Sequence, residues 1–398
     1  MITNFRVKNF RSIVDMELTF TYDEGKAPNG YKEWDTWAFL EDKKTGTRAV
    51  PCLALYGANA SGKSNIILAL ANFLKLVEFG KKSLFETSKA PFFQPNKIHT
   101  DEENCMYSIQ AAFNDNVMHY EVACSKDSII HEKLVINNIE VFSTELATLA
   151  VDSSIELEMY DSNKLQTIYK VECCTEESGR PRQVCLFLHT IGEKYPGLNP
   201  DIQAAFQELI HIWYLPVVPF NEINVFNFKG FEEAIHLLKQ FDLDIVDVRY
   251  TESHDIKTYH LNNKKERVEF DLSDESLGTQ NLLGLLGLIS YVLQNGLTLV
   301  VDELDRSIHP LILIQIVSLF KSKEYNKKGA QLIFTTHTTD LLDAENLLRV
   351  SEVGIVNKTK LSGTTVTRLS EFEGLRNVKN FRKSYMNGEF RGIPYPFI

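Results

Sequence analysis

Residues 57–64 read Gly57-Ala58-Asn59-Ala60-Ser61-Gly62-Lys63-Ser64, a complete G-x-x-x-x-G-K-S pattern. The short apolar run 52–56 precedes this pattern, and residues 66–77, which are rich in Leu, Ala and Ile, follow it. These flanks predict a strand before the pattern and a helix after it, which is the context that a phosphate-binding loop requires. A chance match in a Gly-rich turn before a helix is the alternative, and the full pattern in this context favours the phosphate-binding loop.

The residue types of the loop explain how it would hold a nucleotide. Glycine allows backbone N–H groups to turn toward phosphates without a clashing Cβ, and a helix start directs its positive end at the same anion. In this pattern the lysine reaches the β- and γ-phosphates, and the last serine holds Mg²⁺. We therefore expect ATP and Mg²⁺ as cofactors, bound by Asn59, Gly62, Lys63, Ser64 and Asn65.

A chain of 398 residues is too long for one simple core, so we expect one large α/β unit with an inserted lobe, or two domains. The hydrophobic fraction of 44% and the charged fraction of 24% are ordinary for a folded soluble protein. A net charge of −11 argues against a protein that is basic all over and coats nucleic acid, although a local basic groove stays open.

The six cysteines form no C-x-x-C pair and no metal-like spacing, which predicts reduced thiols in a cytoplasmic protein. The first residues lack the order of a signal peptide, and the longest apolar run, 282–293, is too short to span a bilayer. We therefore expect no membrane association.

Alternating apolar residues predict several strands in the first part of the chain. They are a strand pair over 1–20, a hairpin over 105–124 and further β-like runs at 133–142 and 155–171. So many strands are unusual for a simple parallel phosphate-loop fold. The expected fold is therefore an α/β P-loop NTPase with an added antiparallel sheet and an inserted helical lobe.

The remaining chain alternates between helical and extended patterns. Residues 21–49 are expected to form a surface hairpin or loop, and the helical stretches are 184–213, 231–241 and 281–293. Short strands are expected at 246–250, 257–261 and 267–272.

A second apolar run, Leu297-Thr298-Leu299-Val300-Val301, ends in the carboxylates Asp302 and Glu303. A buried strand that ends in Asp would put one carboxylate beside the Mg²⁺ held by Ser64. The adjacent Glu303 would then polarise the attacking water. A core strand before a solvated acidic turn is the alternative, and the upstream phosphate loop favours the nucleotide site.

A third apolar run, 331–336, ends in His337, which could donate a hydrogen bond to the γ-phosphate. The segment 273–280 precedes a predicted helix, where Ser276 and Gly278 could offer free N–H groups to a phosphate. Ser276 could equally be an ordinary N-cap, and both roles are compatible. In a two-subunit arrangement, this helix start would cover the nucleotide bound by the other chain.

These four motifs, in this order, resemble the ABC-type ATPase heads of the SMC and RecF class. The segment Val7-Lys8-Asn9-Phe10-Arg11-Ser12 is similar to the opening strand pair of that class, in which the counterpart of Arg11 lies close to the nucleotide. The resemblance also implies that Gln94, within 92–95, is the glutamine that contacts Mg²⁺, with a polar loop residue as the alternative.

Within this class the sequence looks most like bacterial AAA-type ATPases of abortive-infection systems, the RloA and AbiLi proteins, and the ATPase parts of OLD and Septu systems. Residues 302–310, 275–279 and the tail 385–394 carry this likeness. It implies nucleotide-binding halves at 1–136 and 296–398, separated by an inserted lobe at 137–295. The insertion has no heptads, so we expect a head without long coiled-coil arms.

The resemblance implies an ATPase that dimerises, or forms a higher oligomer, around a shared ATP site. We expect a sensor or scaffold of an antiphage system that acts with a separately encoded effector, a nuclease being the expected class. No nuclease domain is expected on this chain. A RecF-like DNA-repair ATPase that binds DNA itself is the alternative, and a scaffold with negligible turnover is a third. Basic and aromatic residues are interleaved in the tail 376–391, so contact with DNA, RNA or a partner protein stays open, with a basic segment that packs on an acidic body as the alternative.

Overall fold

The computed structural model describes most of the chain. The described residues are 1–22, 40–41, 46, 48–80, 92–98, 103–151, 162–177, 180–195, 197, 199–215, 237, 245–250, 256–306, 308–343, 347–360, 362–375, 378 and 380–394. Most of the loop predicted at 21–49, nearly all of the helix predicted at 231–241, and Arg376 and Lys379 of the tail lie outside these residues.

Parallel strands form the centre of the molecule. They pair in the order β19 (Val353–Thr359), β5 (Cys52–Tyr56), β18 (Gln331–Thr335), β17 (Thr298–Val301) and β13 (Ile212–Leu215). Every residue of β5, β17 and β18 is buried, which is typical of parallel strands covered on both faces. The strands predicted from the three apolar runs are therefore confirmed and lie side by side.

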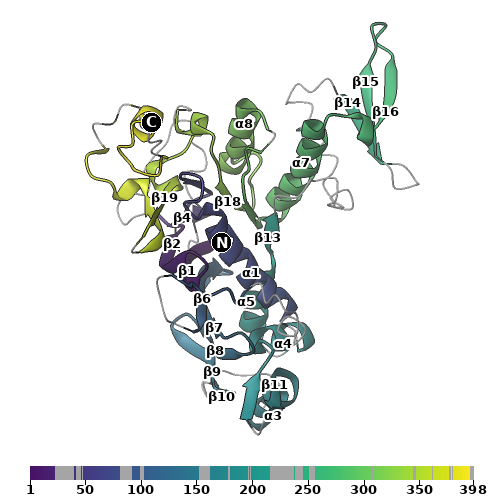
Figure 1. Ribbon diagram of the computed structural model, residues 1–398. Coiled ribbons are helices and arrows are strands. Elements are labelled where there is room, and N and C mark those ends of the chain that lie inside the picture. The colour runs from purple at the N-terminus through teal and green to yellow at the C-terminus, as the bar shows by residue number, and fades with distance from the viewer. Residues whose placement is uncertain are drawn as a thin grey trace.

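Antiparallel strands continue this sheet on the β19 side, as Figure 1 shows. In spatial order they are β20 (Gly363–Arg368), β2 (Ile13–Thr19), β1 (Ile2–Phe10), β6 (Cys105–Phe113), β7 (Asn116–Cys124), β8 (Ile129–Ile136), β9 (Ile139–Glu145) and β10 (Thr148–Val151). The predicted strand pair at 1–20 and the hairpin at 105–124 are confirmed. The antiparallel strands do not form a separate sheet, because β2 pairs with β20 and β20 pairs with β19.

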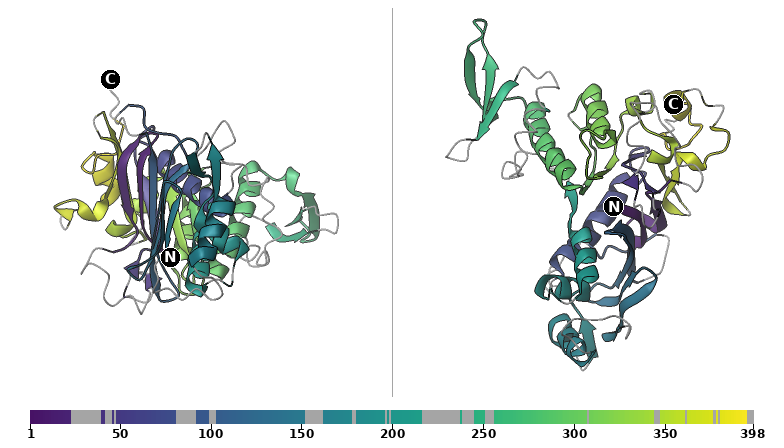
Figure 2. Two further views of the ribbon diagram at one scale, coloured as in Figure 1. Left: turned by 90° about the horizontal axis from the view of Figure 1, so that it is seen from below. Right: turned by 180° about the vertical axis from the view of Figure 1, so that it is seen from behind.

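Helices cover both faces of the sheet (Figures 1 and 2). The helices α1 (Lys63–Phe79), α4 (Phe187–Lys194) and α5 (Pro200–Ile210) belong to one hydrophobic core, and α7 (Leu277–Asn295) and α8 (Pro310–Lys321) to the other. The side chains of β5 alternate between these cores: Leu53 and Leu55 enter the first, whereas Cys52, Ala54 and Tyr56 enter the second. This two-residue period is what a central strand requires.

A small antiparallel sheet of β14 (Ile245–Tyr250), β15 (Ile256–Leu261) and β16 (Arg267–Asp271) projects from the body beside the start of α7 (Figures 1 and 2). The strands predicted in this stretch are confirmed. Shorter elements complete the described chain: β3 (Leu40–Glu41), β4 (Arg48–Ala49), β11 (Cys174–Glu177), β12 (Arg180–Gln183) and α9 (Phe381–Met386). Among the described helices, none is long and apolar enough to cross a bilayer.

The β-like run predicted at 155–171 is wrong over its described part. Residues Ser162–Ile168 form the helix α3, and Tyr169–Cys173 extend it as a single π-helical turn. The buried side chains Leu165, Ile168 and Tyr169 lie three and four positions apart, which is the spacing of one helix face. Residues 155–161 lie outside the described chain, and the β-like run stays a prediction there.

The predicted boundary between the first nucleotide-binding half and the inserted lobe, at 136/137, falls in the turn between β8 and β9. These two strands pair with each other in one hairpin. The helical stretch predicted at 184–213 contains α4 and α5 and ends in β13. The division of the chain into two nucleotide-binding halves and an inserted lobe stays a prediction.

The buried side chain of Gln331 joins the parallel strands to the N-terminal strand. Its Oε1 accepts a hydrogen bond from the Ile2 backbone N–H at 2.6 Å, and its Nε2 donates to the Ile2 carbonyl at 3.1 Å and the Val50 carbonyl at 3.2 Å. An amide is the neutral side chain that can both donate and accept in this way. Gln331 therefore supplies hydrogen-bond partners for the N–H and carbonyl of Ile2 and for the Val50 carbonyl.

Replacement of this amide by an apolar side chain of similar size should destabilise the fold. We expect Gln331→Leu to lower the free energy of unfolding by about 2–4 kcal/mol, because it leaves buried backbone groups of Ile2 without partners. Urea unfolding followed by circular dichroism measures the change. Gln110→Leu, the same substitution at an exposed position of β6, should change stability by less than about 0.5 kcal/mol. Equal effects of the two variants would contradict the role of Gln331.

Candidate functional site

The phosphate-binding loop connects β5 to α1, as the sequence predicts. Gly62 immediately precedes α1 with a φ of 105°, a left-handed conformation that glycine adopts without strain. A Cβ at this position would lie 2.1 Å from the Thr364 Oγ1. Gly62 is therefore required both by its backbone conformation and by the close approach of β20. Ser64 and Asn59 are exposed at the surface of the loop region.

Lys63 folds back onto the loop that carries it. Its Nζ donates hydrogen bonds to the Gly57 carbonyl at 2.7 Å and the Ala58 carbonyl at 3.1 Å, and only 7% of the residue is exposed. Burial lowers the pKa of the Lys63 ammonium below its ordinary value.

Carboxylates on the neighbouring strand ends act on the same ammonium. The charges of Asp302, Glu303 and Asp305 oppose the lowering of the Lys63 pKa, so these groups lie within electrostatic range of its Nζ. That Lys63, Asp302 and Glu303 act on one nucleotide stays a prediction.

Strand register explains why these groups meet. Val301 pairs with Phe334 across β17 and β18, and Thr335 pairs with Leu55 across β18 and β5. Parallel strands in this register end at the same edge of the sheet, where α/β proteins bind ligands. The segments that follow each strand, although far apart in the sequence, therefore converge.

Thr335 holds the two carboxylate-bearing residues in place. Its Oγ1 donates to Asp302 Oδ1 at 2.6 Å and accepts from the Glu303 backbone N–H at 2.7 Å. Glu303 has a φ of 52°, which is an uncommon conformation for a residue with a side chain and costs free energy. The hydrogen bond from its N–H to Thr335 helps to stabilise this conformation.

His337 lies at the end of β18 with an exposed side chain. Its backbone N–H donates to Asp305 Oδ2 at 2.9 Å, and the same carboxylate oxygen accepts from the Thr338 hydroxyl at 3.0 Å. Asp305 therefore ties the turn after β17 to the turn after β18. This arrangement fixes the backbone of His337 beside the carboxylates, and its imidazole is exposed at the surface.

The structure also brings Arg11, Gln94 and Asn65 together. The Arg11 Nε donates to Gln94 Oε1 at 2.5 Å, and its Nη1 donates to Asn65 Oδ1 at 3.2 Å. The backbone N–H of Arg11 donates to the Gln94 carbonyl at 2.7 Å. The turn between β1 and β2, the glutamine loop and the first turn of α1 thus form one cluster. Arg11 is exposed, whereas Asn65 and Gln94 are half-buried, and their contacts with a nucleotide or Mg²⁺ stay a prediction.

Two hydroxyl groups connect this cluster to the phosphate loop. Asn65 Nδ2 donates to the Ser12 Oγ at 2.7 Å, and Ser12 lies 2.7 Å from the Thr364 Oγ1, which donates to the Ser61 carbonyl at 3.0 Å. No local pattern indicated the positioning roles of Ser12, Thr335 and Thr364. Thr335 lies within a motif that was recognised, whereas Thr364 carries no local signal because it is about 300 residues from its partner.

Ser276 and Gly278 lie at the start of α7, beside the projecting sheet and away from the phosphate loop of the same chain (Figure 1). Ser276 is an N-cap: its Oγ accepts from the Thr279 backbone N–H at 3.1 Å. Ser276 and its neighbour Leu277 are exposed. The expected capping role is confirmed, and the contact with a nucleotide on a second chain stays a prediction.

The donor set at the edge of the sheet fits a nucleotide with a divalent cation. An ammonium and a helix start provide positive charge for phosphates, and hydroxyl and carboxylate oxygens are the ligands that Mg²⁺ prefers. Ser64, Asp302 and Gln94 are the oxygen donors that were predicted for the metal. Glu303 adds a second carboxylate next to them, which suits a base that activates water.

The role of Thr335 predicts a metal-dependent effect. We expect Thr335→Val to raise the Mg²⁺ concentration needed for half-maximal ATP binding by about 10–100-fold, because Asp302 loses the hydrogen bond that orients it. A fluorescent ATP analogue titrated at several Mg²⁺ concentrations measures this shift. Thr298→Val changes the same residue type at the opposite end of β17 and should leave the Mg²⁺ dependence unaltered. An unchanged Mg²⁺ dependence in Thr335→Val would contradict the positioning role.

Comparison with solved structures finds SMC head domains at low identity. The SMC head domain from Thermotoga maritima is 15% identical and has a TM-score of 0.46, with 92% of this chain and 98% of that chain covered. The Smc head domain with an extended coiled coil bound to the C-terminal domain of ScpA, derived from Pyrococcus furiosus, is 13% identical at a TM-score of 0.46, with 98% and 99% covered. An SmcHead bound to the C-winged helix domain of ScpA is 12% identical and has a TM-score of 0.45, with 95% of this chain and 99% of that chain covered.

No curated protein matches the sequence. Because the TM-scores are low, the family match rather than these likenesses supports an assignment. Residues 52–343 match the family model described as "AAA domain, putative AbiEii toxin, Type IV TA system". This range contains the phosphate loop, both carboxylates and His337, and it spans most of the chain. The chain therefore belongs to this AAA-domain family.

Proposed function

We propose that the protein binds ATP with Mg²⁺ and hydrolyses it to ADP and phosphate. The observation that supports the proposal is the register of β5, β18 and β17, which end at one edge of the sheet and are followed there by the phosphate loop and by Asp302 and Glu303. Membership of an AAA-domain family supports the same activity. Bound Mg²⁺ would supply charge neutralisation of the phosphates.

Each residue of the site has a distinct part in this proposal. Lys63 exchanges its two carbonyl partners for phosphate oxygens, which bind an ammonium more strongly than neutral carbonyls do. Ser64 and Asp302 hold the metal, and Gln94 reaches it from the adjacent loop. Glu303 accepts a proton from the attacking water, and His337 donates a hydrogen bond to the γ-phosphate.

We further propose that a second copy of the chain completes the site. Ser276 and Gly278 lie at an exposed helix start that faces away from the phosphate loop of their own chain. A helix start carries free N–H groups and a partial positive charge that favour phosphate. In a two-fold dimer, the helix start of each chain would contact the nucleotide held by the other.

In the cell, we propose that the ATPase acts as a sensor or regulatory scaffold of an antiphage, abortive-infection system. The family description, with its toxin of a type IV system, and the resemblance to RloA and AbiLi proteins support this role. A separately encoded effector, for which a nuclease is the expected class, would carry out the toxic reaction. A net charge of −11 favours a protein partner over broad nucleic-acid binding.

The shared site predicts a specific trapping experiment. We expect Glu303→Gln to lower the rate of phosphate release by about 10²–10⁴-fold, since the amide cannot accept the proton of the water. ATP binding should persist, so ATP should hold the variant as a dimer in light scattering. Glu324→Gln, at an exposed position, should behave like the wild type, and Lys63→Ala should neither bind ATP nor dimerise with it.

Mixing two inactive variants tests whether the site is composite. Lys63→Ala damages the phosphate loop, and Ser276→Tyr should block the helix start, so each variant alone should be inactive. An equal mixture should regain activity, up to about half of the wild-type rate, because each mixed dimer keeps one intact site of its two. A mixture of the folded variants that forms mixed dimers in light scattering and stays inactive would exclude the shared site.

The defence role predicts that nucleotide binding is needed for protection. Cells that express the complete locus with Lys63→Ala should lose resistance to phage in a plating assay, while the protein level stays unchanged in an immunoblot. Resistance that persists in this variant would show that nucleotide binding by this protein is not needed for protection. Tight, salt-sensitive DNA binding by the purified chain in a gel shift would instead support a repair ATPase.

A further inference from the structure

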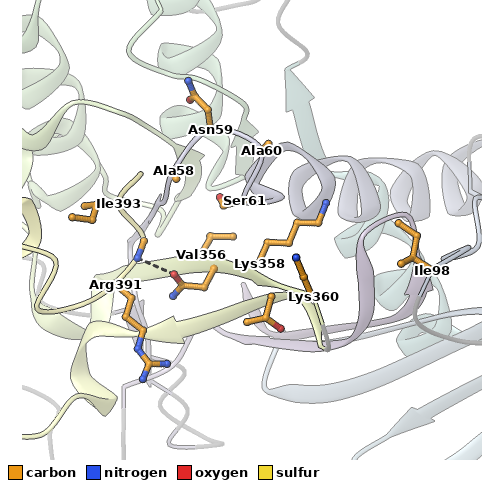
Figure 3. Close-up of a pocket in the computed structure, with 13 residues that line it drawn as sticks. Ala58, Asn59, Ala60, Ser61, Ile98, Val356, Lys358, Lys360, Arg391 and Ile393 are labelled. Atoms are coloured by element: carbon orange, nitrogen blue, oxygen red, sulfur yellow. Dashed lines mark hydrogen bonds between the residues drawn. The ribbon is translucent and has the colours of Figure 1, made fainter. Parts of the chain in front are cut away.

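A cavity of about 880 Å³ lies beside the phosphate loop. The loop forms one wall, the end of β19 forms a second wall, and the C-terminal segment forms a third, as Figure 3 shows. The residues that line the cavity are Ala58, Asn59, Ala60, Ser61, Ile98, Val356, Asn357, Lys358, Thr359, Lys360, Arg391, Gly392 and Ile393. A volume of this size is typical of a small-molecule site.

This cavity is distinct from the phosphate site. Lys63, Asp302 and Glu303 do not line it, although the loop residues 58–61 do. Within the sheet, β5 has β18 on one side and β19 on the other. The carboxylates follow β17, beyond β18, whereas the cavity lies against β19. The phosphate loop thus separates the carboxylates from the cavity.

The polarity of the site determines which part of a nucleotide points toward the cavity. The γ-phosphate must face Glu303 and the metal ligand Asp302, because hydrolysis takes place there. A triphosphate held in the loop with this orientation directs its α-phosphate, and hence its ribose and base, away from β17. The β19 side is the opposite direction, and the cavity opens there.

The lining chemistry suits a nucleoside. Ile393 and Ile98 provide apolar surface for a base, and backbone groups of the loop and β19 provide hydrogen-bonding partners. The hydroxyl of Ser61 is buried and has no hydrogen-bond partner among the described residues. Burial of an unpaired hydroxyl costs free energy that a ligand could recover.

Positive charge at the rim also favours an anionic ligand. Lys358 and Lys360 are exposed, and within the described chain neither forms an ion pair, although acidic residues outnumber basic ones by 53 to 42. In Figure 3 the Arg391 side chain points away from the loop, so Lys358 and Lys360 are the lining residues that place positive charge at the rim.

The C-terminal wall is docked firmly on the body of the protein. The Gly392 N–H donates to Asn357 Oδ1 at 2.8 Å, and the Tyr385 hydroxyl donates to the Gly392 carbonyl at 3.0 Å. The rings of Tyr385 and Tyr56 lie 5.7 Å apart, which connects this wall to the last residue of β5. Gly392 has a φ of 71°, and a Cβ there would lie 2.6 Å from Ile355, so only glycine allows this docking.

We propose that this cavity receives the base and ribose of the bound nucleotide, and that the segment 391–393 is a wall of the nucleotide site. The proposal rests on the proposed ATPase function, which supplies the orientation of the triphosphate. In this proposal, β19 and the C-terminal segment determine which base the site accepts. Nucleotide binding then depends on the docking of that segment against the body of the protein.

Comparison of ATP with inorganic tripolyphosphate separates this proposal from the ATPase proposal. Isothermal titration of the full chain should show that Ile393→Trp, which fills the cavity, weakens ATP binding by about tenfold or more and leaves tripolyphosphate binding unchanged. Ile139→Trp, at an exposed position of β9 outside the cavity, should leave both affinities unchanged. Lys63→Ala should abolish binding of both ligands.

The outcomes are distinguishable. Unchanged ATP affinity in a folded Ile393→Trp, or an equal loss for both ligands, would overturn the nucleoside cavity and leave the ATPase proposal intact. A wild-type chain that binds neither ligand would overturn both proposals. A selective loss of ATP affinity supports the cavity.

A second measurement needs no variant. The azide of 8-azido-ATP reacts, on illumination, with the groups that surround the base. Mass spectrometry of the labelled wild-type chain should locate the label at residue 98, 356–360 or 391–393. Labelling concentrated in any other segment, and suppressed by excess ATP, would overturn the assignment of the cavity.

Discussion

The hydroxyl of Thr335 ties together the ends of β17 and β18, and the candidate site depends on this contact. It donates to Asp302 and accepts from the Glu303 backbone, and the Thr335 carbonyl accepts from the Leu304 N–H. Three interactions from one residue hold the turn that carries both carboxylates. Because β18 also pairs with β5, the same residue sets the distance between the carboxylates and the phosphate loop.

Side-chain hydrogen bonds join the N-terminal strands to the parallel strands at both ends of the sheet. Gln331 pairs with the backbone of Ile2 at the start of β18, and Thr364 links Ser12 to the phosphate loop at the opposite end of the parallel strands. These side-chain contacts explain why the antiparallel strands continue the parallel sheet. They also place Arg11 and the Gln94 loop beside the first turn of α1, where a nucleotide would be bound.

The proposed functions all depend on the position of the phosphate loop in the sheet. The phosphate loop lies between β18, which leads toward the carboxylates, and β19, which borders the cavity and the C-terminal segment. A nucleotide in this position would contact the hydrolytic groups at one end and the C-terminal segment at the other. The exposed start of α7 then remains available to a second chain. One ligand would therefore connect the tail, the catalytic edge and the partner, which is the property that a nucleotide-dependent scaffold needs.

The sequence by itself determined the strand–loop–helix unit at 52–77, the two carboxylates after β17 and the histidine after β18, because these depend on residue types at fixed local spacing. It also predicted the strand pair at 1–20 and the hairpin at 105–124 from a two-residue period. Local patterns failed at 162–173, where helical spacing was taken for a strand. Only the tertiary structure decided that Thr364 packs on Gly62, that Gln94 meets Arg11 and that Gly392 docks on Asn357. Those contacts follow from the order of strands in the sheet, which is set by the packing of distant segments and leaves no periodic signal along the chain.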